Sequence, residues 1–384
     1  MRKILFVCKY PTVISENLLT KLSGQMNACK KLGYDVYYIE WSGDSFTLVS
    51  KSDDTRQKIL TTTYANWSLE KYYHSLFFID LYRTVEKVTK DEKFDILYIR
   101  NMPFFPPFNK ALTTINANTK IILELPTYPI RHELISIGRF RRIVFRLIER
   151  YKMKIYEKVT LFTVCGKKVN GTLYGKKAVN IYNGIDVDFV PLRIPDIKHD
   201  EINILLLASM SYWQGFDRMI YSLKEYVGDK KIILHFVGND GDGSLKTWKN
   251  LASELEIEDK IVFHGALYKK DLDNIFNKCD IGIGCLGLYR KNINDGAVLK
   301  VREYMSRGLP FVYAGSDKAL EYAQEFALQV PNNETIIEMQ RLVEFAERYK
   351  GLTDIPVKMR KYAIKYMSWE SEFKKILRLV EKEI

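Results

Sequence analysis

The stretch NDGAVLKVREYMSRGLPFVYAG, residues 294–315, predicts a helix followed directly by a buried strand. Val298, Val301 and Met305 recur at helical spacing, which gives the helix one apolar face. The run LPFVYAG that follows is apolar enough for a strand covered on both sides. A helix that leads into such a strand is half of a βαβ unit, so the stretch predicts a parallel sheet with helices on its faces.

The polar residues of this stretch form a second pattern. Lys300, Glu303, Tyr304 and Arg307 lie at i, i+3, i+4 and i+7, so we expect them on one face, turned away from the packed side. Asp295 is placed to cap the start of the helix. A solvated face held by Lys–Glu pairs explains this stripe. A ligand site also explains it, with Glu303 accepting from a diol and Lys300 meeting a phosphate.

Short apolar runs alternate with longer amphipathic ones along the whole chain. We therefore expect an α/β protein of two doubly wound, Rossmann-like domains in series. The first domain is predicted at 1–190 and the second at 191–365, because residues 187–201 interrupt the pattern with two prolines and several charges. Residues 366–384 predict an amphipathic helix that crosses back to the first domain.

Composition narrows the class of partner. The 384 residues are 47% hydrophobic and carry a formal net charge of +12, which suits nucleic acid, an anionic membrane surface or phosphorylated small molecules. No zinc-ligand spacing and no RNA-binding motif is found, so we expect no nucleic-acid partner. The five scattered cysteines predict reduced thiols and a cytoplasmic protein. The opening apolar run is too short for a signal peptide, and no window is long enough to span a membrane.

Candidate binding residues follow the predicted strands of the second half. The loop after the run at 202–209 contains Trp213, Gln214 and Gly215, and Asp217 is placed to cap a helix whose free N–H groups would receive phosphate. An ordinary strand–turn–helix explains this segment as well.

Two further strand ends are rich in glycine. HFVGNDGDGS contains Gly238, and FHGAL contains Gly265 and Ala266. His235 and His264 lie within these runs, and we expect both to be structural.

These motifs together resemble the retaining glycosyltransferases of family 4, which have the GT-B fold of two Rossmann-like domains facing across a cleft. Asp295 and Glu303 match that family's acidic–x7–acidic signature, with aspartate in place of the first glutamate. YNGID at residues 182–186 is similar to the turn that ends its first domain, and YWQGFDRMI to its KG-D loop. The runs LPTYP, GFDR and LKVREY resemble a branch found in bacterial capsule and exopolysaccharide clusters.

The resemblance implies an enzyme that moves a sugar from a nucleotide-diphosphate sugar to an acceptor with retention of configuration. It implies no metal, because cations and a helix N-terminus stabilise the leaving diphosphate. The resemblance further implies that Glu303 holds the ribose and that Asp295, with the backbone of Gly296 and Ala297, meets the sugar. The full expected donor site consists of Trp213, Gln214, Gly215, Gly238, Gly265, Ala266, Arg290, Lys291, Gly296, Ala297, Leu299, Lys300 and Glu303.

The sequence departs from the family pattern in two places. Ser209 and Gln214 stand where the family has arginine and lysine, so Arg290, Lys291 and Lys300 are expected to supply the charge for the diphosphate. The first domain has LELPTYPIRHE where many members carry a histidine that faces the sugar. The expected catalytic residues are therefore Glu124, Thr127 and Asp295, with His132 further along. A front-face retaining mechanism needs no protein nucleophile.

Residues 139–158 are the most basic segment, with an apolar stripe at helical spacing. A helix that lies on an anionic membrane has this pattern, and so does a core-packed helix with a solvated basic face. On the first reading, the protein is peripheral on the inner membrane face and takes a lipid-diphosphate-linked saccharide as acceptor. The expected membrane-facing residues are Arg139, Arg142, Arg146 and Arg150.

Two other functions fit the same architecture. A phosphosugar epimerase is one, because doubly wound sheets support many chemistries. A non-catalytic protein that binds nucleotide or membrane is the other, given Ser209 and Gln214.

Overall fold

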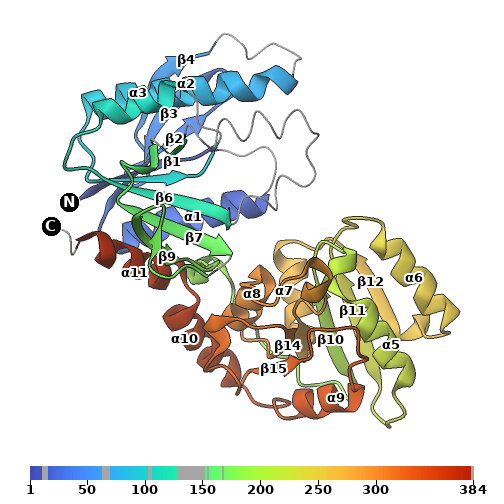
Figure 1. Cartoon of the computed structure of the whole chain (residues 1–384). Coiled ribbons are helices and arrows are strands. Elements are labelled where there is room, and N and C mark those ends of the chain that lie inside the picture. Colours follow the sequence, from blue (N-terminus) through green and yellow to red (C-terminus); the bar gives the residue numbers. More distant parts are fainter. Residues whose placement is uncertain are drawn as a thin grey trace. The chain divides into compact units, whose positions relative to one another are not determined.

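The computed structural model describes residues 1–10, 16–62, 70–102, 106–128, 152–153, 155–166 and 168–381. The chain forms two compact units (Figure 1). Unit 1 consists of Met1–Tyr182 with Glu372–Ile384, and unit 2 consists of Asn183–Ser371. Each unit is built around a sheet whose central strands are parallel, which confirms the predicted α/β class with two Rossmann-like domains.

The sheet of unit 1 has the order β4-β3-β2-β1-β5-β6-β7-β9-β8. The central strands β2-β1-β5-β6-β7-β9 pair in parallel. At the two edges, β3, β4 and β8 pair with their neighbours antiparallel. The strands are β1 (Lys3–Val7), β2 (Asp35–Trp41), β3 (Ser45–Ser50), β4 (Arg56–Thr61), β5 (Ile96–Arg100), β6 (Lys120–Tyr128), β7 (Leu161–Gly166), β8 (Thr172–Leu173) and β9 (Lys176–Asn180). The helices are α1 (Glu16–Lys31), α2 (Glu70–Asp91), α3 (Pro106–Thr114) and most of α11 (Trp369–Glu381).

Strand β1 shows why the central strands are apolar at every position. Leu5 is fully buried in the cluster that contains Phe77 of α2 and Phe108 of α3. Phe6 points to the opposite face, where its ring centroid lies 6.2 Å from that of Phe373 in α11. Helices therefore cover both faces, as Figure 1 shows for α2 and α11. Such a strand has no polar side, which explains its uninterrupted apolar sequence.

The sheet of unit 2 has the order β12-β11-β10-β13-β14-β15, and its described strands pair in parallel throughout. When the six strands are numbered along the chain from β10, their order in the sheet is 3-2-1-4-5-6. This is the strand order of a dinucleotide-binding domain. The strands are β10 (Ile202–Leu207), β11 (Ile232–Val237), β12 (Ile261–Gly265), β13 (Ile281–Ile283), β14 (Phe311–Ala314) and β15 (Ala327–Val330). The helices are α5 (Asp217–Glu225), α6 (Ser244–Glu254), α7 (Lys269–Lys278), α8 (Leu299–Arg307), α9 (Met339–Glu347) and α10 (Ile355–Tyr366).

Alternate residues of β10 serve the two faces of this sheet. Ile204 and Leu206 belong to the core cluster formed with α5, α6 and α9. Leu205 belongs to the cluster formed with α7, α8 and α10. The chain order of the strands reverses beside β10, so the loops after β10 and β13 meet at the edge where doubly wound sheets bind ligands.

A tyrosine holds β10 and β13 together where their pairing stops. The two strands pair through Ile204–Ile281 and Leu205–Gly282. At the carboxyl end, the Tyr304 hydroxyl donates to the Ile283 carbonyl at 3.0 Å and accepts from the Leu207 N–H at 3.3 Å. A Cβ on Gly282 would lie 2.9 Å from the Tyr304 ring, so a glycine is needed beneath it. A side chain from α8 therefore replaces a sheet hydrogen bond at the ligand-binding edge.

Helix α8 differs from the sequence prediction in two respects. It begins at Leu299 after Val298, so Asp295 does not cap it. Tyr304 and Arg307 are buried, so the predicted single exposed stripe is wrong for these two residues. The reason is that Tyr304 packs against the sheet through Leu207 and Ile283. Arg307 packs against α7, where it binds Asp273 and lies over the Phe276 ring. Lys300 and Glu303 remain partly exposed.

The division between the units falls after Tyr182, ahead of the predicted boundary at 190/191. The Ile185 N–H donates to the Met367 carbonyl at 2.9 Å, and the Trp369 N–H donates to the Ile185 carbonyl at 3.2 Å. These bonds attach the predicted end of the first domain to unit 2. For the same reason, the chain rejoins unit 1 at Glu372 and not at residue 366.

We expect Tyr304→Phe to lower the free energy of unfolding by about 1–3 kcal/mol, because two buried backbone groups lose a hydrogen-bond partner. Denaturant titration followed by fluorescence would measure the change. Tyr313→Phe is the matched control, since the half-buried Tyr313 hydroxyl bonds to none of the described residues. The control should change stability by less than about 0.5 kcal/mol. Equal effects of the two variants would contradict the bridging role of Tyr304.

Candidate functional site

The loops after β10 and β13 are in backbone contact at the carboxyl edge of the unit 2 sheet. The Leu286 N–H donates to the Gln214 carbonyl at 2.9 Å, and the Cys285 thiol donates to the Trp213 carbonyl at 3.3 Å. Gly215 has φ of 70°, and a Cβ there would lie 2.7 Å from the nitrogen of Gly287. The structure thus brings Trp213, Gln214 and Gly215 together with the loop that carries the predicted cations.

Lys300 reaches this junction from the first turn of α8. Its Nζ donates to Gln214 Oε1 at 2.7 Å and lies 4.5 Å from the centroid of the Phe216 ring. Burial lowers the pKa of Lys300 to about 7, although the nearby Cys285 opposes the shift. No carboxylate of the described residues lies within ion-pair distance of this ammonium. The site therefore holds a cation whose charge no described side chain neutralises.

Arg290 is in the opposite situation. Arg290 lies on the 3-10 helix η5 (Leu288–Lys291). Its guanidinium donates to the Asp217 carboxylate at 2.9 and 2.8 Å and to the Glu334 carboxylate at 3.2 and 2.8 Å. Burial alone would lower the pKa of Arg290, but these carboxylates raise it above its usual value. Its charge is already balanced, so Arg290 joins the loop after β13 to the start of α5.

The same contacts correct the predicted role of Asp217. Helix α5 begins at Asp217 itself, with Phe216 at the N-cap position and no side-chain cap. The Asp217 carboxylate binds Arg290 instead of the helix N–H groups. Lys291, by contrast, is exposed, and its Nζ lies 3.9 Å from the centroid of the Trp213 ring.

Glycines allow the backbone at the ends of β10, β11 and β12 to approach closely. The Gly238 N–H donates to the Gly265 carbonyl at 2.8 Å, so these two predicted residues are neighbours. Gly238 has φ of 138°, and a Cβ there would lie 1.6 Å from the Ala208 carbonyl oxygen. A side chain cannot be placed at this position without moving the backbone. Ala266 follows Gly265 and is half-buried.

The histidines beside these glycines are structural, as predicted. His235 Nδ1 and His264 Nε2 are 3.0 Å apart, and His235 Nε2 is 2.8 Å from Asn203 Oδ1. Burial lowers the pKa of His235 to about 3, so its ring is neutral at physiological pH.

The segment before α8 runs alongside Ser316. The Gly296 N–H donates to the Ser316 carbonyl at 2.9 Å, and the Ser316 N–H donates to the Asn294 carbonyl at 2.7 Å. The Ser316 hydroxyl also donates to the Asp295 carboxylate. This pairing keeps Asp295 in an extended segment, which is why it does not cap the helix. The carbonyl of Ala297 accepts from Asn183 Nδ2 at 3.1 Å, and Leu299 is exposed.

Glu303 lies one helical turn beyond Leu299. Its carboxylate is 27% exposed, and Oε1 accepts from Arg307 Nε at 2.9 Å. Arg307 also binds Asp273 at 2.5 Å, so its charge is shared between two carboxylates. Glu303 thus has a fixed carboxylate with a second oxygen that can accept from a ligand.

Glu124 is fully buried in unit 1, on β6. It accepts from the Tyr98 hydroxyl at 2.7 Å, from Arg100 at 2.5 Å and from Gln25 at 3.2 Å, and its carboxylate lies 3.2 Å from the Lys21 ammonium. Burial alone would raise the pKa of Glu124, but Lys21, Arg100 and the Tyr98 hydrogen bond lower it to about 2. The carboxylate is therefore ionised and enclosed. Its four partners come from α1 and β5, and the sequence analysis named none of them.

The remaining first-domain predictions are only partly within the described residues. Thr127 lies on β6, and His132 lies outside the described residues. So do the predicted membrane-facing residues Arg139, Arg142, Arg146 and Arg150. In the described end of that basic segment, Lys152 and Ile155 are each 2% exposed. This end therefore packs into unit 1.

Two general features concern the described residues alone. No group of three or more His, Cys, Asp or Glu side chains in them is arranged to hold a metal ion. Within the same parts of the chain, no helix combines the length and apolarity needed to cross a membrane.

Residues 192–366 match the family Glycosyl transferases group 1. No curated protein matches the chain significantly. This match covers most of unit 2, including the junction of β10, β13 and α8. The chain therefore carries a glycosyltransferase group 1 domain, and the protein is a glycosyltransferase.

Solved structures show the same fold over the whole chain. A glycosyltransferase from Rickettsia africae has a TM-score of 0.62 and 16% identity, with 99% of this chain and 98% of that chain covered. Sucrose-phosphate synthase from Thermosynechococcus elongatus has a TM-score of 0.63 and 13% identity, with 100% and 99% covered. HepE from Anabaena, in complex with UDP and glucose, has a TM-score of 0.58 and 15% identity, with 100% of both chains covered. The fold is thus that of GT-B glycosyltransferases.

We expect Gly215→Ala to lower the free energy of unfolding by about 2 kcal/mol or more, because a Cβ there collides with the loop after β13. Gly243→Ala is the matched control. Gly243 also has positive φ, 89°, but a Cβ there has nothing within 4 Å. The control should cost only the backbone strain, about 1 kcal/mol. Thermal unfolding of both variants measures the difference, and equal losses would rule out a close approach of the two loops.

Proposed function

We propose that this glycosyltransferase takes its sugar from a nucleotide-diphosphate donor bound by unit 2 and transfers it to a saccharide acceptor with retention of configuration. The observation that carries the proposal is the position of Lys300. Its ammonium lies where the loops after β10 and β13 meet, without a carboxylate partner among the described residues. A diphosphate would supply the missing negative charge.

The contact with Gln214 explains how this chain manages without the usual loop cations. Gln214 stands where the family 4 resemblance places a lysine, and Lys300 Nζ donates to its side chain at 2.7 Å. Lys300 of α8 therefore places a positive charge beside Gln214, where the family has a lysine in the loop itself. Arg290 is expected to contribute less to the diphosphate, because Asp217 and Glu334 balance its charge. Lys291 remains a second candidate cation, since it is exposed above Trp213.

The start of α8 adds further groups of the right kind. The first N–H groups of a helix have no acceptor within the helix, and they carry partial positive charge. They would share the diphosphate with Lys300, which belongs to the same turn. Glu303, one turn further along, would accept from the ribose hydroxyls. HepE was solved in complex with UDP-glucose, which supports a nucleotide-sugar donor for a protein of this fold.

The proposed reaction breaks the bond between the anomeric carbon and the diphosphate oxygen. Negative charge develops on the leaving diphosphate, where Lys300 and the α8 N–H groups stabilise it. The acceptor hydroxyl attacks the same face of the sugar, and its proton passes to the leaving phosphate oxygen. Asp295, fixed by Ser316, would orient the sugar. Catalytic roles for Glu124 and Thr127 remain predictions, and an enclosed Glu124 would act by positioning Lys21 and Arg100.

We further propose that the acceptor is a lipid-diphosphate-linked saccharide used in surface polysaccharide biosynthesis at the inner membrane face. The formal net charge of +12 and the basic sequence at residues 139–158 support an anionic surface as partner. On this proposal, unit 1 serves the acceptor and unit 2 serves the donor.

The first test is thermal shift with calorimetric follow-up against UDP, GDP, CMP, ADP and their common sugars. We expect nucleotides of one base to stabilise the protein selectively. Glu303→Ala should lower the affinity for that nucleotide about tenfold, because the contact with the ribose is lost. Glu258→Ala is the control, since Glu258 is exposed at the amino end of β12. If no nucleotide binds to folded protein, the donor site is wrong. Sugar transfer or donor hydrolysis by the purified chain then tests catalysis.

The pKa of Lys300 predicts a pH dependence of donor binding. Below pH 7 the free protein already carries the ammonium, whereas above pH 7 Lys300 must take up a proton when the diphosphate binds. Donor affinity should therefore fall as pH rises above about 7, by up to about tenfold per pH unit. Calorimetry with the selected nucleotide sugar between pH 6 and pH 9 measures this.

Two variants isolate the contribution of Lys300. Lys300→Gln should bind more weakly, with an affinity that no longer depends on pH in this range. Lys231→Gln is the control, because Lys231 is exposed at the amino end of β11, opposite the site. It should keep the wild-type affinity and profile. A wild-type slope in Lys300→Gln would show that another group titrates.

A further inference from the structure

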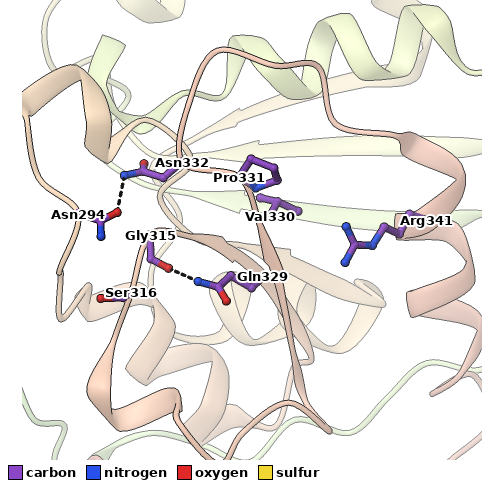
Figure 2. Close-up of a pocket in the computed structure, with 8 residues that line it drawn as sticks. All are labelled: Asn294, Gly315, Ser316, Gln329, Val330, Pro331, Asn332 and Arg341. Carbon is purple, nitrogen blue, oxygen red and sulfur yellow. Dashed lines mark hydrogen bonds between the residues drawn. The ribbon is translucent and has the colours of Figure 1, made fainter.

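A pocket of unit 2 lies at the carboxyl ends of β14 and β15. It has a volume of about 420 Å³ and opens to solvent. Figure 2 shows the residues that line it. Five polar side chains converge on it, and the turn at Pro331 completes the wall. These side chains are Asn294, Ser316, Gln329, Asn332 and Arg341.

The pocket is separate from the proposed donor contacts. In the sheet order β10-β13-β14-β15, the donor cation lies at the first two strands and the pocket at the last two. Neighbouring strands are about 4.8 Å apart, so the two places are on different parts of the sheet edge. None of the residues proposed to contact the donor lines the pocket, although Ser316, which binds Asp295, does.

One wall is held rigid by its own hydrogen bonds. Asn332 Nδ2 donates to the Ile293 carbonyl at 3.1 Å and to Asn294 Oδ1 at 3.3 Å, while Asn332 Oδ1 accepts from the Tyr289 N–H at 3.1 Å. Gln329 Nε2 donates to the Gly315 carbonyl at 2.5 Å, as Figure 2 also shows. These bonds leave the Asn294 amide group as a donor and Gln329 Oε1 as an acceptor. The pocket therefore offers both kinds of partner to a hydroxyl-bearing ligand.

The opposite wall provides a positive charge. Arg341 extends from α9, and Figure 2 shows its guanidinium pointing toward the other lining residues. In the described parts of the chain, no carboxylate pairs with this guanidinium, and no acidic residue lines the pocket. An unpaired guanidinium recognises carboxylate or phosphate through two parallel hydrogen bonds.

We propose that this pocket binds an anionic sugar, with its phosphate or carboxylate on Arg341 and its hydroxyls on Asn294 and Gln329. The volume is in the range of small-molecule sites. Val330 and Pro331 give the lining an apolar part against which the C–H face of a sugar ring can pack. Ser316 lines the pocket and also binds the Asp295 carboxylate, so the bound sugar touches the segment that carries Asp295.

The test is calorimetry of the full chain with glucose 1-phosphate, glucuronic acid, neutral glucose and inorganic phosphate. The phosphate and carboxylate sugars identify which anion the pocket takes. We expect at least one of them to bind, and Arg341→Gln to weaken it about tenfold or more. Glucose and inorganic phosphate should each bind more weakly than the anionic sugar, because each lacks half of the recognised groups.

Two control variants locate the binding. Arg348→Gln, an exposed residue at the end of the same helix, should leave affinity unchanged. Lys300→Gln should also leave it unchanged, which separates this pocket from the donor site. The proposal is overturned if neither anionic sugar binds, if Arg341→Gln binds as tightly as the wild type, or if Lys300→Gln abolishes binding. These results do not depend on nucleotide binding, so the pocket and the donor site can fail independently.

Discussion

The bridge that the Tyr304 hydroxyl makes between Leu207 and Ile283 determines the geometry of unit 2 at its ligand-binding edge. Because β10 and β13 stop pairing after Leu205 and Gly282, their loops leave the sheet separately and meet again through Gln214 and Leu286. Helix α8 supplies the tyrosine and also supplies Lys300, one turn earlier. The residue that joins the strands and the residue that we propose binds the phosphate are therefore positioned by one helix.

Among the described residues, some cations pair with carboxylates, whereas the cations that we propose bind ligands do not. In unit 2, Arg290 forms ion pairs with Asp217 and Glu334. In unit 1, the Glu124 carboxylate forms ion pairs with Lys21 and Arg100. Such groups hold elements together, and removing one partner would leave a charge buried without compensation. Lys300 and Arg341 have no such carboxylate in the described residues. Unpaired cations at the carboxyl edge of a parallel sheet are the groups best suited to anionic ligands.

Much of the fold follows from sequence patterns. The uninterrupted apolar runs at β1 and β10 predict doubly covered parallel strands, and the structure confirms two Rossmann-like units. Glycines at strand ends allow a close approach of the backbone, and the structure has such approaches at Gly215 and Gly238. The capping roles of Asp217 and Asp295 were wrong, because Arg290 and Ser316 bind these carboxylates from distant parts of the chain. Helical periodicity could not show that Tyr304 and Arg307 are buried, since Tyr304 bonds the sheet backbone and Arg307 packs against α7.

The sequence by itself determined the class of fold. It also predicts the strand ends at which ligands are expected and supplies the cations near them. These are local properties, set by apolar spacing and by residue type. Only the tertiary structure decided which cations are free. Arg290 and Lys300 are equally charged in the sequence, but long-range packing places two carboxylates beside the first and an uncharged glutamine beside the second. Electrostatic compensation depends on distance in space, which spacing along the chain does not report.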